Sequence, residues 1–481
     1  MKPKAYWKTT AFRVLAGFAL WSCFYGLGTL PVRLWDESRQ AINSLEMLQS
    51  GQYGYSTFDG MPDFYNTKPP LLIWLQTLSG ALFGFSEWSL RLPSALAGVC
   101  TGLLVFVFVF RNSDSEAAAL LAGVSLMAAP GWIDEHVART GDYDALLTLW
   151  LCAAMCAYYR FERESHPGSA HLFLLFTFLA VATKSTAGLM FLPGIFIWSI
   201  STGALKKLLR VRGFLLLSAG MLLLLSAWYA VHESLTPGYL RAVWNNEVSA
   251  RFVQPSEGHS GPWYYYLLQL ALTDFPWWPL AIAGFLASLL LLRSRLAGFI
   301  AWQLTAFLAL LSIGATKIEW YAAPALPLLA MGTGILLLPA GNARIRNSIL
   351  AASLLSIMAL WSQQTLNRIT KPIELQMPGP EDELSLYLQG RHSLLRPDTA
   401  FRVITADYNP TVLVYTRMPD RRFHFSNLDW RQLDSSEKVI AWHAHQLDSL
   451  KTWYPYRLLS RSGHLHFIEI QGRKRSLIHR K

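Results

Sequence analysis

The sequence predicts an all-α polytopic membrane protein that carries a small soluble α/β domain at its C-terminal end. Of its 481 residues, 52% are hydrophobic and 15% are charged, and the mean hydropathy is +0.26. Soluble proteins usually carry about 25% charged residues. Apolar runs near the length that crosses a bilayer recur along most of the chain, and basic residues gather in alternate loops between them. Together these patterns predict repeated membrane crossings.

The first apolar run, 11–32, follows Lys2, Lys4 and Lys8 and lacks a small-residue cleavage site. We therefore expect a retained first helix and not a removed signal peptide. Several later runs are shorter than the roughly 20 residues of a usual span, so we expect about 11–13 transmembrane helices. The later runs are 88–110, 117–131, 144–159, 171–182, 187–202, 213–231, 263–292, 296–314, 320–339 and 347–362.

Basic residues in alternate loops predict the orientation in a bacterial inner membrane. The side that collects them is expected to be cytoplasmic, together with the N-terminus. Counting the apolar segment 71–85 as a span would invert this pattern, so we expect it to lie along the outer surface as an interfacial helix. The basic residues are Lys2, Lys4, Lys8, Arg111, Arg160, Arg163, Lys206, Lys207, Arg210, Arg212, Arg293, Arg295, Arg344 and Arg346.

The composition changes after the last apolar run, which divides the chain into a transmembrane domain, 1–366, and a soluble domain, 367–481. The soluble domain falls on the periplasmic side in the predicted topology. Its short apolar runs between polar segments are typical of an α/β domain. The elements expected in it are a helix at 381–389 and strands at 401–404, 411–415 and 438–442.

The net charge of +11 does not indicate a nucleic-acid partner, because much of it lies in the short loops where topology explains it. We expect a membrane partner and no nucleic acid. The four cysteines lie in or beside apolar helices without Cys-x-x-Cys spacing. They are predicted to pack as small hydrophobic side chains.

Ionisable side chains next to apolar segments converge on the face opposite the basic loops. Such groups are costly at a membrane unless they bind something. Lysine, arginine and tyrosine side chains there can bind phosphate oxygens. One or two carboxylates can accept a proton from an attacking hydroxyl or stabilise positive charge on a sugar ring. The residues are Asp36, Glu37, Lys68, Arg139, Asp142, Asp144, Lys184, His259, Lys317 and Tyr321.

Each of these residues, taken alone, could have a purely structural role, and only the gathering of all of them on one face favours a functional site. The structural alternatives are helix N-capping for Asp36 and Asp144, extension toward the lipid interface for Lys68, a position at a helix end for Lys184 and Lys317, and an ordinary loop position for His259.

Several short motifs follow one another along the chain in an order that is typical of a known enzyme family. The most specific motifs are Asp36-Glu37-Ser38-Arg39, Lys68-Pro69-Pro70 and Arg91-Leu92-Pro93-Ser94. The later motifs are individually weaker: Asp144-Ala145-Leu146-Leu147, Thr183-Lys184, His259 with Gly261-Pro262-Trp263, Phe275-Pro276-Trp277, and Lys317 with Tyr321 and Pro324. In this order the chain resembles the C-type (GT-C) glycosyltransferases that use polyprenyl-phosphate sugars. It is most similar to the lipid A aminoarabinose transferases, and the protein O-mannosyltransferases are more distant relatives.

The resemblance implies a GT-C fold and assigns roles to the ionisable residues. Asp36 would lie at the reaction centre as base or orienting group, and Asp144 would be the second catalytic carboxylate. Lys68 would bind the donor or acceptor phosphate, with Lys184, Lys317 and Tyr321 near the same lipid phosphate. From their place on the same face, Arg139 is a further candidate for phosphate binding, and Glu37, Asp142 and His259 are candidate substrate-binding residues.

One position departs from the family pattern. The aminoarabinose transferases carry a glutamate directly before Lys-Pro-Pro, which holds a metal with a later histidine, whereas Thr67 stands there in this chain. Threonine is a poor zinc ligand. We therefore assign no metal ligand and expect no required cofactor, and dependence on a divalent metal stays open.

The sequence thus predicts a membrane glycosyltransferase that moves a sugar from a polyprenyl-phosphate donor to a lipid acceptor on the periplasmic face. The acceptor would be lipid A or another envelope glycolipid. The alternative is a protein O-glycosyltransferase acting on secreted Ser or Thr. A lipid-sugar flippase is less favoured, because the charges cluster at one face and no internal repeat is visible. A non-catalytic membrane subunit is the third alternative.

Overall fold

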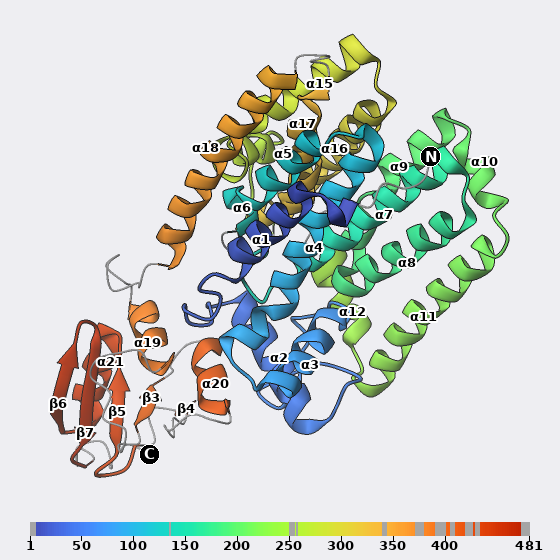
Figure 1. Cartoon of the computed structure of the whole chain (residues 1–481). Helices are drawn as coiled ribbons and strands as arrows, with labels where there is room; N and C mark the ends of the chain where they lie inside the picture. The colour runs from blue at the N-terminus through green and yellow to red at the C-terminus, as the bar shows by residue number, and fades with distance from the viewer. Residues whose placement is uncertain are drawn as a thin grey trace.

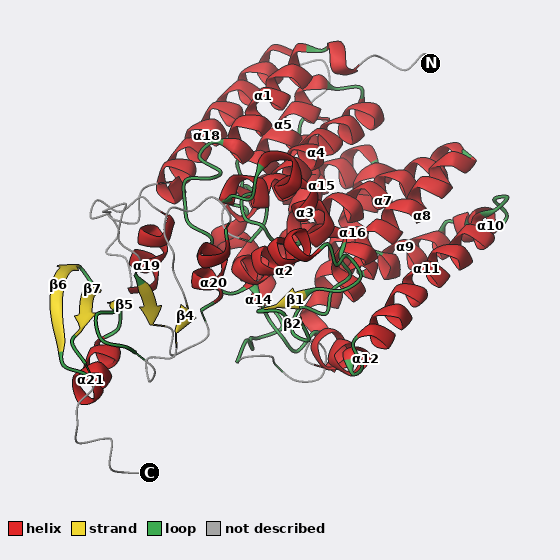
Figure 2. Cartoon of the chain, turned by 90° about the horizontal axis from the view of Figure 1, so that it is seen from below, coloured by secondary structure: helices red, strands yellow, loops and turns green. Residues whose placement is uncertain are grey.

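The computed structural model of the chain is a mostly helical bundle with a small sheet at its C-terminal end (Figure 1). The helices α2 and α3 and the C-terminal domain lie at the same end of the bundle, as the second view also shows (Figure 2). The structure describes residues 6–133, 136–249, 255, 258–338, 344–370, 380–389, 401–404, 409–418, 427–428 and 433–472.

The helices follow the predicted apolar segments closely. The longer helices are α1 (Thr10–Phe24), α2 (Asp36–Ser50), α3 (Leu71–Phe83), α4 (Glu87–Ser113), α5 (Glu116–Met127), α7 (Asp144–Glu164), α8 (Pro167–Lys184), α9 (Leu192–Ser201), α11 (Phe214–Leu235), α15 (Trp278–Leu292), α16 (Arg295–Ile313), α17 (Leu326–Ile335) and α18 (Arg344–Thr370). The shorter ones are η1 (Tyr6–Lys8), α6 (Pro130–Ile133), η2 (Ser185–Leu189), α10 (Ala204–Leu209), α12 (Tyr239–Val243), η3 (Trp244–Ser249), α14 (Tyr265–Gln269), η4 (Leu270–Asp274) and η5 (Glu319–Ala325).

Within the described residues, four helices are long and apolar enough to cross a membrane: α4, α8 continued by η2, α11 and α16. The predicted run 263–292 would be a fifth span, but it bends by 112° between Tyr265–Asp274 and Trp278–Leu292. Pro276 and Pro279 stand at this bend, and proline has no N–H with which to continue a helix. These helices confirm the prediction of a membrane protein with several spans, and the total of about 11–13 spans stays a prediction.

The predicted interfacial segment forms helix α3, with 13 residues. Such a helix is about 20 Å long, too short for a full crossing. Leu78, Leu82 and Phe83 are exposed on it, whereas Gln76 and Ile73 are buried. This apolar outer side and buried inner side suit a helix that lies in a membrane surface.

The C-terminal domain contains a five-stranded sheet in the order β4-β3-β5-β7-β6. The strands β4, β3 and β5 are parallel, and β7 and β6 are antiparallel to their neighbours. The predicted helix and two of the predicted strands are confirmed. The elements are α19 (Pro380–Gln389), β3 (Arg402–Ile404), α20 (Pro410–Arg417), β4 (Asn427–Leu428), β5 (Lys438–Ala441), α21 (Ala444–Trp453), β6 (Tyr456–Ser462) and β7 (Leu465–Ile470).

The strand predicted at 411–415 is wrong, because this run lies inside helix α20. Its β-branched composition favours a strand. The local start signal outweighs that preference: the Asn409 side chain accepts a hydrogen bond from Val412 N at 3.1 Å, and Pro410 occupies the first turn.

Helix α20 also joins the C-terminal domain to the rest of the protein. Tyr415 on α20 donates its hydroxyl to Glu87 Oε1 at 2.9 Å and accepts from Val32 N at 2.8 Å. Val412 and Tyr415 share one buried cluster with Ile42 and Leu45 of α2. The first long loop after α1 and the soluble domain therefore form one packed unit.

Candidate active site

A buried ion pair fixes the loops that carry the candidate site. Glu37 in the first turn of α2 contacts Arg91 of α4 at 2.6 Å, with side-chain exposures of 0% and 3%. Glu37 also accepts hydrogen bonds from Gly141 N and Arg33 N, both at 2.8 Å. One carboxylate therefore ties α2, α4 and the loop before α7 together, and this brings Asp36 next to the loop that carries Asp142.

The lack of a side chain at Gly141 favours this close approach. A Cβ atom there would lie 3.0 Å from both Gln76 Nε2 and Leu90 Cγ. The Gln76 side chain donates to the carbonyl of Gly141 at 2.8 Å. The loop before α7 therefore packs directly on α3 and α4.

Asp144 and Lys184 form the central ion pair of the site. Lys184 Nζ lies 2.6 Å from Oδ1 and 2.7 Å from Oδ2 of Asp144, and both side chains are nearly buried. Asp144 is the first residue of α7, and Tyr143 holds the N-cap position before it. The helix N-capping alternative is therefore wrong for this aspartate, whose carboxylate pairs with Lys184.

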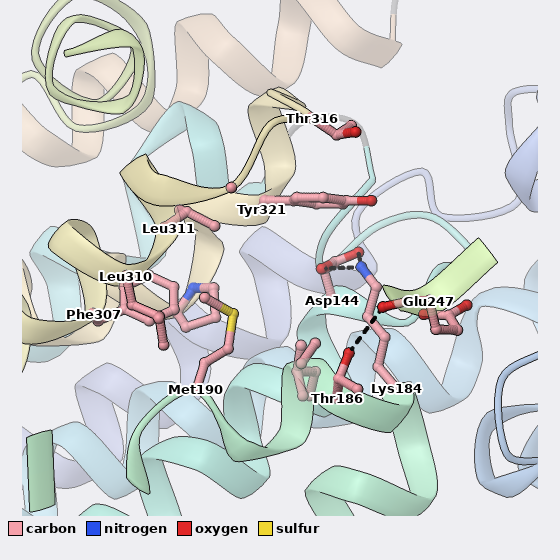
Figure 3. A pocket seen from close by; sticks show the side chains of 14 residues that line it. Asp144, Lys184, Thr186, Met190, Glu247, Phe307, Leu310, Leu311, Thr316 and Tyr321 are labelled. Carbon is pink, nitrogen blue, oxygen red and sulfur yellow. Dashed lines mark hydrogen bonds and ion pairs between the residues drawn. The ribbon is translucent and has the colours of Figure 1, made fainter. Parts of the chain in front are cut away.

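A cavity opens beside this ion pair. The charged pair Asp144 and Lys184 lies at one end with Tyr321, and the apolar side chains of Met190 and Phe307 lie at the other (Figure 3). Lys184 Nζ also lies 4.9 Å from the centre of the Tyr321 ring. The remaining lining residues are Leu147, Thr186, Ala187, Glu247, Leu310, Leu311, Gly314, Thr316 and Pro324. The pocket thus combines a long apolar wall with a charged end.

Lys68 points inward and not toward the lipid interface. Its Nζ lies 3.6 Å from Glu247 Oε1 in η3 and 5.4 Å from the Tyr143 ring. Thr67 donates to the same carboxylate at 3.3 Å. Glu247 lines the pocket, so Lys68 lies next to a residue of the pocket wall.

Asp36, His136 and Asp142 gather a short distance from the ion pair. One side-chain ligand atom from each lies within 4.8 Å of the others. Burial raises the pKa of Asp142, but the nearby charges of His136 and Lys184 hold that pKa below its usual range. Trp35, and not Asp36, holds the N-cap position of α2, so the helix N-capping alternative is wrong for Asp36. The carboxylates of Asp36 and Asp142 lie close together beside His136.

Two predicted cationic residues, Arg139 and Lys317, serve local structure here. Arg139 donates to the carbonyls of Ser22 and Tyr25 at the end of α1. Lys317 Nζ donates to the carbonyls of Ser312 and Gly314, at the C-terminal end of α16, at 2.7 and 2.6 Å. The helix-end alternative therefore describes Lys317.

His259 is exposed, and its carbonyl accepts from Lys317 N at 3.0 Å. Its side chain is not part of the cavity beside Asp144. Glu37 is the structural hub described above, with its carboxylate already shared among three partners.

The sequence reading missed two residues, His136 and Glu247. Each is a single ionisable residue in a long polar segment, without a spacing that would mark it. The one available signal was that both segments fall on the face predicted to carry the site.

A second cavity lies on the other side of η5. Tyr321 lines the first cavity, whereas Glu319, Trp320 and Ala323 line the second. The wall of the second includes the ionisable side chains of His136, Asp274 and Glu319. Its other lining residues are Pro130, Gly131, Val137, Gln269, Leu272, Thr273, Pro276, Trp361, Gln364 and Thr365. His136 thus lines the second cavity, whereas Asp144 and Lys184 line the first.

A family model and curated proteins match parts of the chain. The model described as dolichyl-phosphate-mannose-protein mannosyltransferase matches residues 67–230, which is less than half of the chain. An uncharacterised protein of Aquifex aeolicus is 27% identical over 70% of this chain and 65% of its own length. An undecaprenyl phosphate-alpha-4-amino-4-deoxy-L-arabinose arabinosyl transferase of Aeromonas hydrophila is 31% identical over 54% of this chain and 48% of its own. The chain spans less than two thirds of the length of each relative.

Solved structures match the fold over nearly the whole chain. ArnT from Cupriavidus metallidurans, bound to undecaprenyl phosphate, aligns with a TM-score of 0.73 at 17% identity over 95% of this chain and 97% of that one. The oligosaccharyltransferase of Archaeoglobus fulgidus aligns with a TM-score of 0.51 at 14% identity over 86% of this chain and 64% of that one. At these identities the likeness establishes the shared fold.

Proposed function

Because the chain is a relative of the polyprenyl-phosphate-sugar glycosyltransferases and has their C-type fold, we propose that it transfers a sugar from a polyprenyl-phosphate donor to a lipid acceptor. The observation that carries this proposal is the first cavity, in which an apolar wall ends at a buried lysine. A polyprenyl chain suits the wall, and a phosphate suits the lysine.

Lys184 is the residue that would bind the donor phosphate. Its ammonium group already lies between both oxygens of Asp144. A phosphate at the mouth of the cavity would share this ammonium with Asp144, while the hydroxyl of Tyr321 would donate to another phosphate oxygen. Lys68 would add charge from the side of Glu247. These contacts strengthen as the departing phosphate gains charge, and this is the condition for catalysis.

The transfer is a displacement at the anomeric carbon. An acceptor oxygen forms the new bond to this carbon, and the bond from the carbon to the phosphate oxygen breaks. The electron pair of that bond leaves with the lipid phosphate. The acceptor proton goes to a carboxylate, for which Asp36 is our choice because its carboxylate lies near His136, which lines the second cavity.

The second cavity would admit the acceptor. Its described lining includes the carboxylates Asp274 and Glu319 and the amides of Gln269 and Gln364, with no lysine or arginine. Carboxylates accept hydrogen bonds from hydroxyl groups and repel phosphate. We therefore propose that the attacking group is a hydroxyl of an envelope glycolipid.

A protein acceptor is the second candidate. The family model that matches residues 67–230 is described by its transfer of mannose to protein, and this favours a Ser or Thr hydroxyl. A hydroxyl group of a glycolipid or of a protein would enter the same cavity. The two candidate functions therefore differ only in whether the lipid or the protein acceptor gains the sugar.

The proposed location is a bacterial inner membrane with the site and the C-terminal domain on the periplasmic face. The support is the charge of the loops, because the basic residues gather away from the site. Lipid-linked donors and envelope acceptors are both accessible from that face.

The test is a transfer assay with purified protein, polyprenyl-phosphate sugars and separate lipid and protein acceptor pools, read by mass spectrometry. We expect Lys184→Ala and Asp144→Asn to lower the rate at least 100-fold, since each removes half of the central pair. Glu164→Gln is the matched control, because Glu164 is an exposed acidic residue at the far end of the same helix. Transfer that survives both site substitutions would exclude this assignment.

A further inference from the structure

Two tyrosines that line neither cavity lie next to the backbone that carries the lysines of the site. Tyr229 lies toward the C-terminal end of α11, and Tyr239 is the first residue of α12. We propose that both are positioning residues, which hold Lys184 and Lys68 where these lysines meet the donor phosphate. This role rests on the proposed function, because it is defined by the phosphate that the two lysines would bind.

The backbone directly after Lys184 has an unusual conformation. Ser185 has a φ of 47° and a ψ of −128°, a combination that residues with a side chain rarely adopt. The hydroxyls of Ser185 and Tyr229 share a hydrogen bond of 3.1 Å. The chain then folds back on α8 at Gly188, where a Cβ atom would lie 2.3 Å from Val181 N. Such strain persists where neighbouring contacts hold it, and Tyr229 supplies one of these contacts beside the lysine.

The backbone directly before Lys68 is held in a comparable way. Tyr239 is 0% exposed and donates its hydroxyl to the carbonyl of Thr67 at 2.9 Å. The Thr67 hydroxyl donates to Glu247 at 3.3 Å, and the same carboxylate lies 3.6 Å from Lys68 Nζ. Two prolines follow the lysine and fix φ on its other side. Without the Tyr239 hydroxyl, the buried carbonyl of Thr67 would lose this donor, and the start of the lysine segment would lose an anchor.

The two tyrosines belong to one aromatic cluster. The His232 ring stacks on the Tyr239 ring with centroids 3.5 Å apart and planes 3° apart, and Tyr229 stacks on Tyr239 at 6.2 Å. Trp228 meets the rings of His232 and Tyr239 edge-on. Phenylalanine keeps ring contacts of this kind. A Tyr→Phe substitution therefore removes the hydroxyl and leaves the packing of the cluster in place.

The structural alternative is that the hydroxyls only dock helix α11. This helix packs beside α8 at the edge of the bundle, and only 6% of its apolar stretch is buried (Figure 1). Docking alone, however, does not require that the two hydroxyls reach the residues next to Lys184 and Lys68. A docking contact supports stability, whereas a positioning contact also affects how tightly the lysines bind the donor, so the two roles predict different measurements.

The experiment determines the donor KM and kcat of purified full-length Tyr229→Phe and Tyr239→Phe, together with their affinity for undecaprenyl phosphate. A displaced lysine weakens binding of the phosphate, so we expect the donor KM and the Kd of undecaprenyl phosphate to rise about tenfold or more. Loss of folded protein lowers kcat alone, because the remaining molecules bind the donor normally. Tyr53→Phe is the matched control, since Tyr53 is an exposed tyrosine after α2, and it should keep the wild-type values.

A double-mutant cycle tests whether Tyr229 acts through Ser185. Ser185→Ala removes the partner hydroxyl, so it should raise the donor KM as Tyr229→Phe does. The double variant should show no further rise, because both substitutions break the same hydrogen bond. Effects that multiply in the double variant would overturn the role of Tyr229.

The possible outcomes separate the positioning role from the transferase itself. If the wild type binds undecaprenyl phosphate and both Tyr→Phe variants keep its KM and Kd, the positioning role is overturned and the transferase stands. A lower thermal midpoint with unchanged KM would show that the hydroxyls only dock α11. If the wild type does not bind undecaprenyl phosphate, the donor site is refuted, and the positioning role is refuted with it.

Discussion

At the scale of single residues, the site depends on how buried charges are paired. The Glu37 carboxylate interacts with Arg91 and with two backbone N–H groups, so it anchors three segments through one group. Arg91 in turn donates to the carbonyls of Leu27 and Pro31. A buried pair with all its hydrogen-bonding atoms engaged contributes specificity of structure, and the loss of one partner is costly because the other charge stays buried.

We therefore expect Arg91→Met to destabilise the protein by about 3–5 kcal/mol. The measurement is the midpoint of thermal unfolding in detergent. The control is Arg160→Met, because the pair of Arg160 with Glu164 is exposed and such pairs contribute about 0–1 kcal/mol. Equal shifts in the two variants would show that the Glu37 hub is not a main source of stability.

At the scale of elements, helix α20 shows where local patterns succeed and fail. The run 411–415 has the composition of a strand, but Asn409 and Pro410 start a helix, and that helix buries Tyr415 against α2 and α4. A contact between residues more than 300 positions apart cannot be read from a local window. In contrast, the strands at 402–404 and 438–441 lie inside the sheet, where local composition and tertiary environment agree.

The docking of α20 gives a prediction for Tyr415→Phe. The substitution leaves Val32 N and the Glu87 carboxylate without their shared hydroxyl partner. Since an unsatisfied buried group costs about 1–3 kcal/mol, we expect amide hydrogen exchange at Val32 to become about tenfold faster or more. Tyr454→Phe is the control, because the Tyr454 hydroxyl accepts from Leu433 N within the soluble domain. Unchanged exchange at Val32 would mean that apolar packing alone holds α20 in place.

At the scale of the whole molecule, loop charge predicted the face of the site but not its internal pairing. The positive-inside pattern places Asp36, Lys68, Asp144 and Lys184 on one predicted face, and in the structure Lys184 pairs with Asp144 while Lys68 lies beside Glu247. Which cation pairs with which carboxylate depends on how the loops fold over each other. Glu247 and His136 lacked any local signal, so only the packed structure reveals them.

The same loop charges give a prediction about orientation. Glu164 lies at the basic end of α7, and Asp448 lies on α21 of the soluble domain, and both side chains are exposed. With the exposed Cys100 replaced by serine, Asp448→Cys should react with a membrane-impermeant thiol reagent in intact spheroplasts, whereas Glu164→Cys should react only after the membrane is opened. Basic loops resist transfer across the inner membrane, and this is why we expect Glu164 on the cytoplasmic side. The reverse labelling would place the two cavities on the cytoplasmic face, away from envelope acceptors, and would contradict the proposed location while leaving the chemistry of Asp144 and Lys184 unchanged.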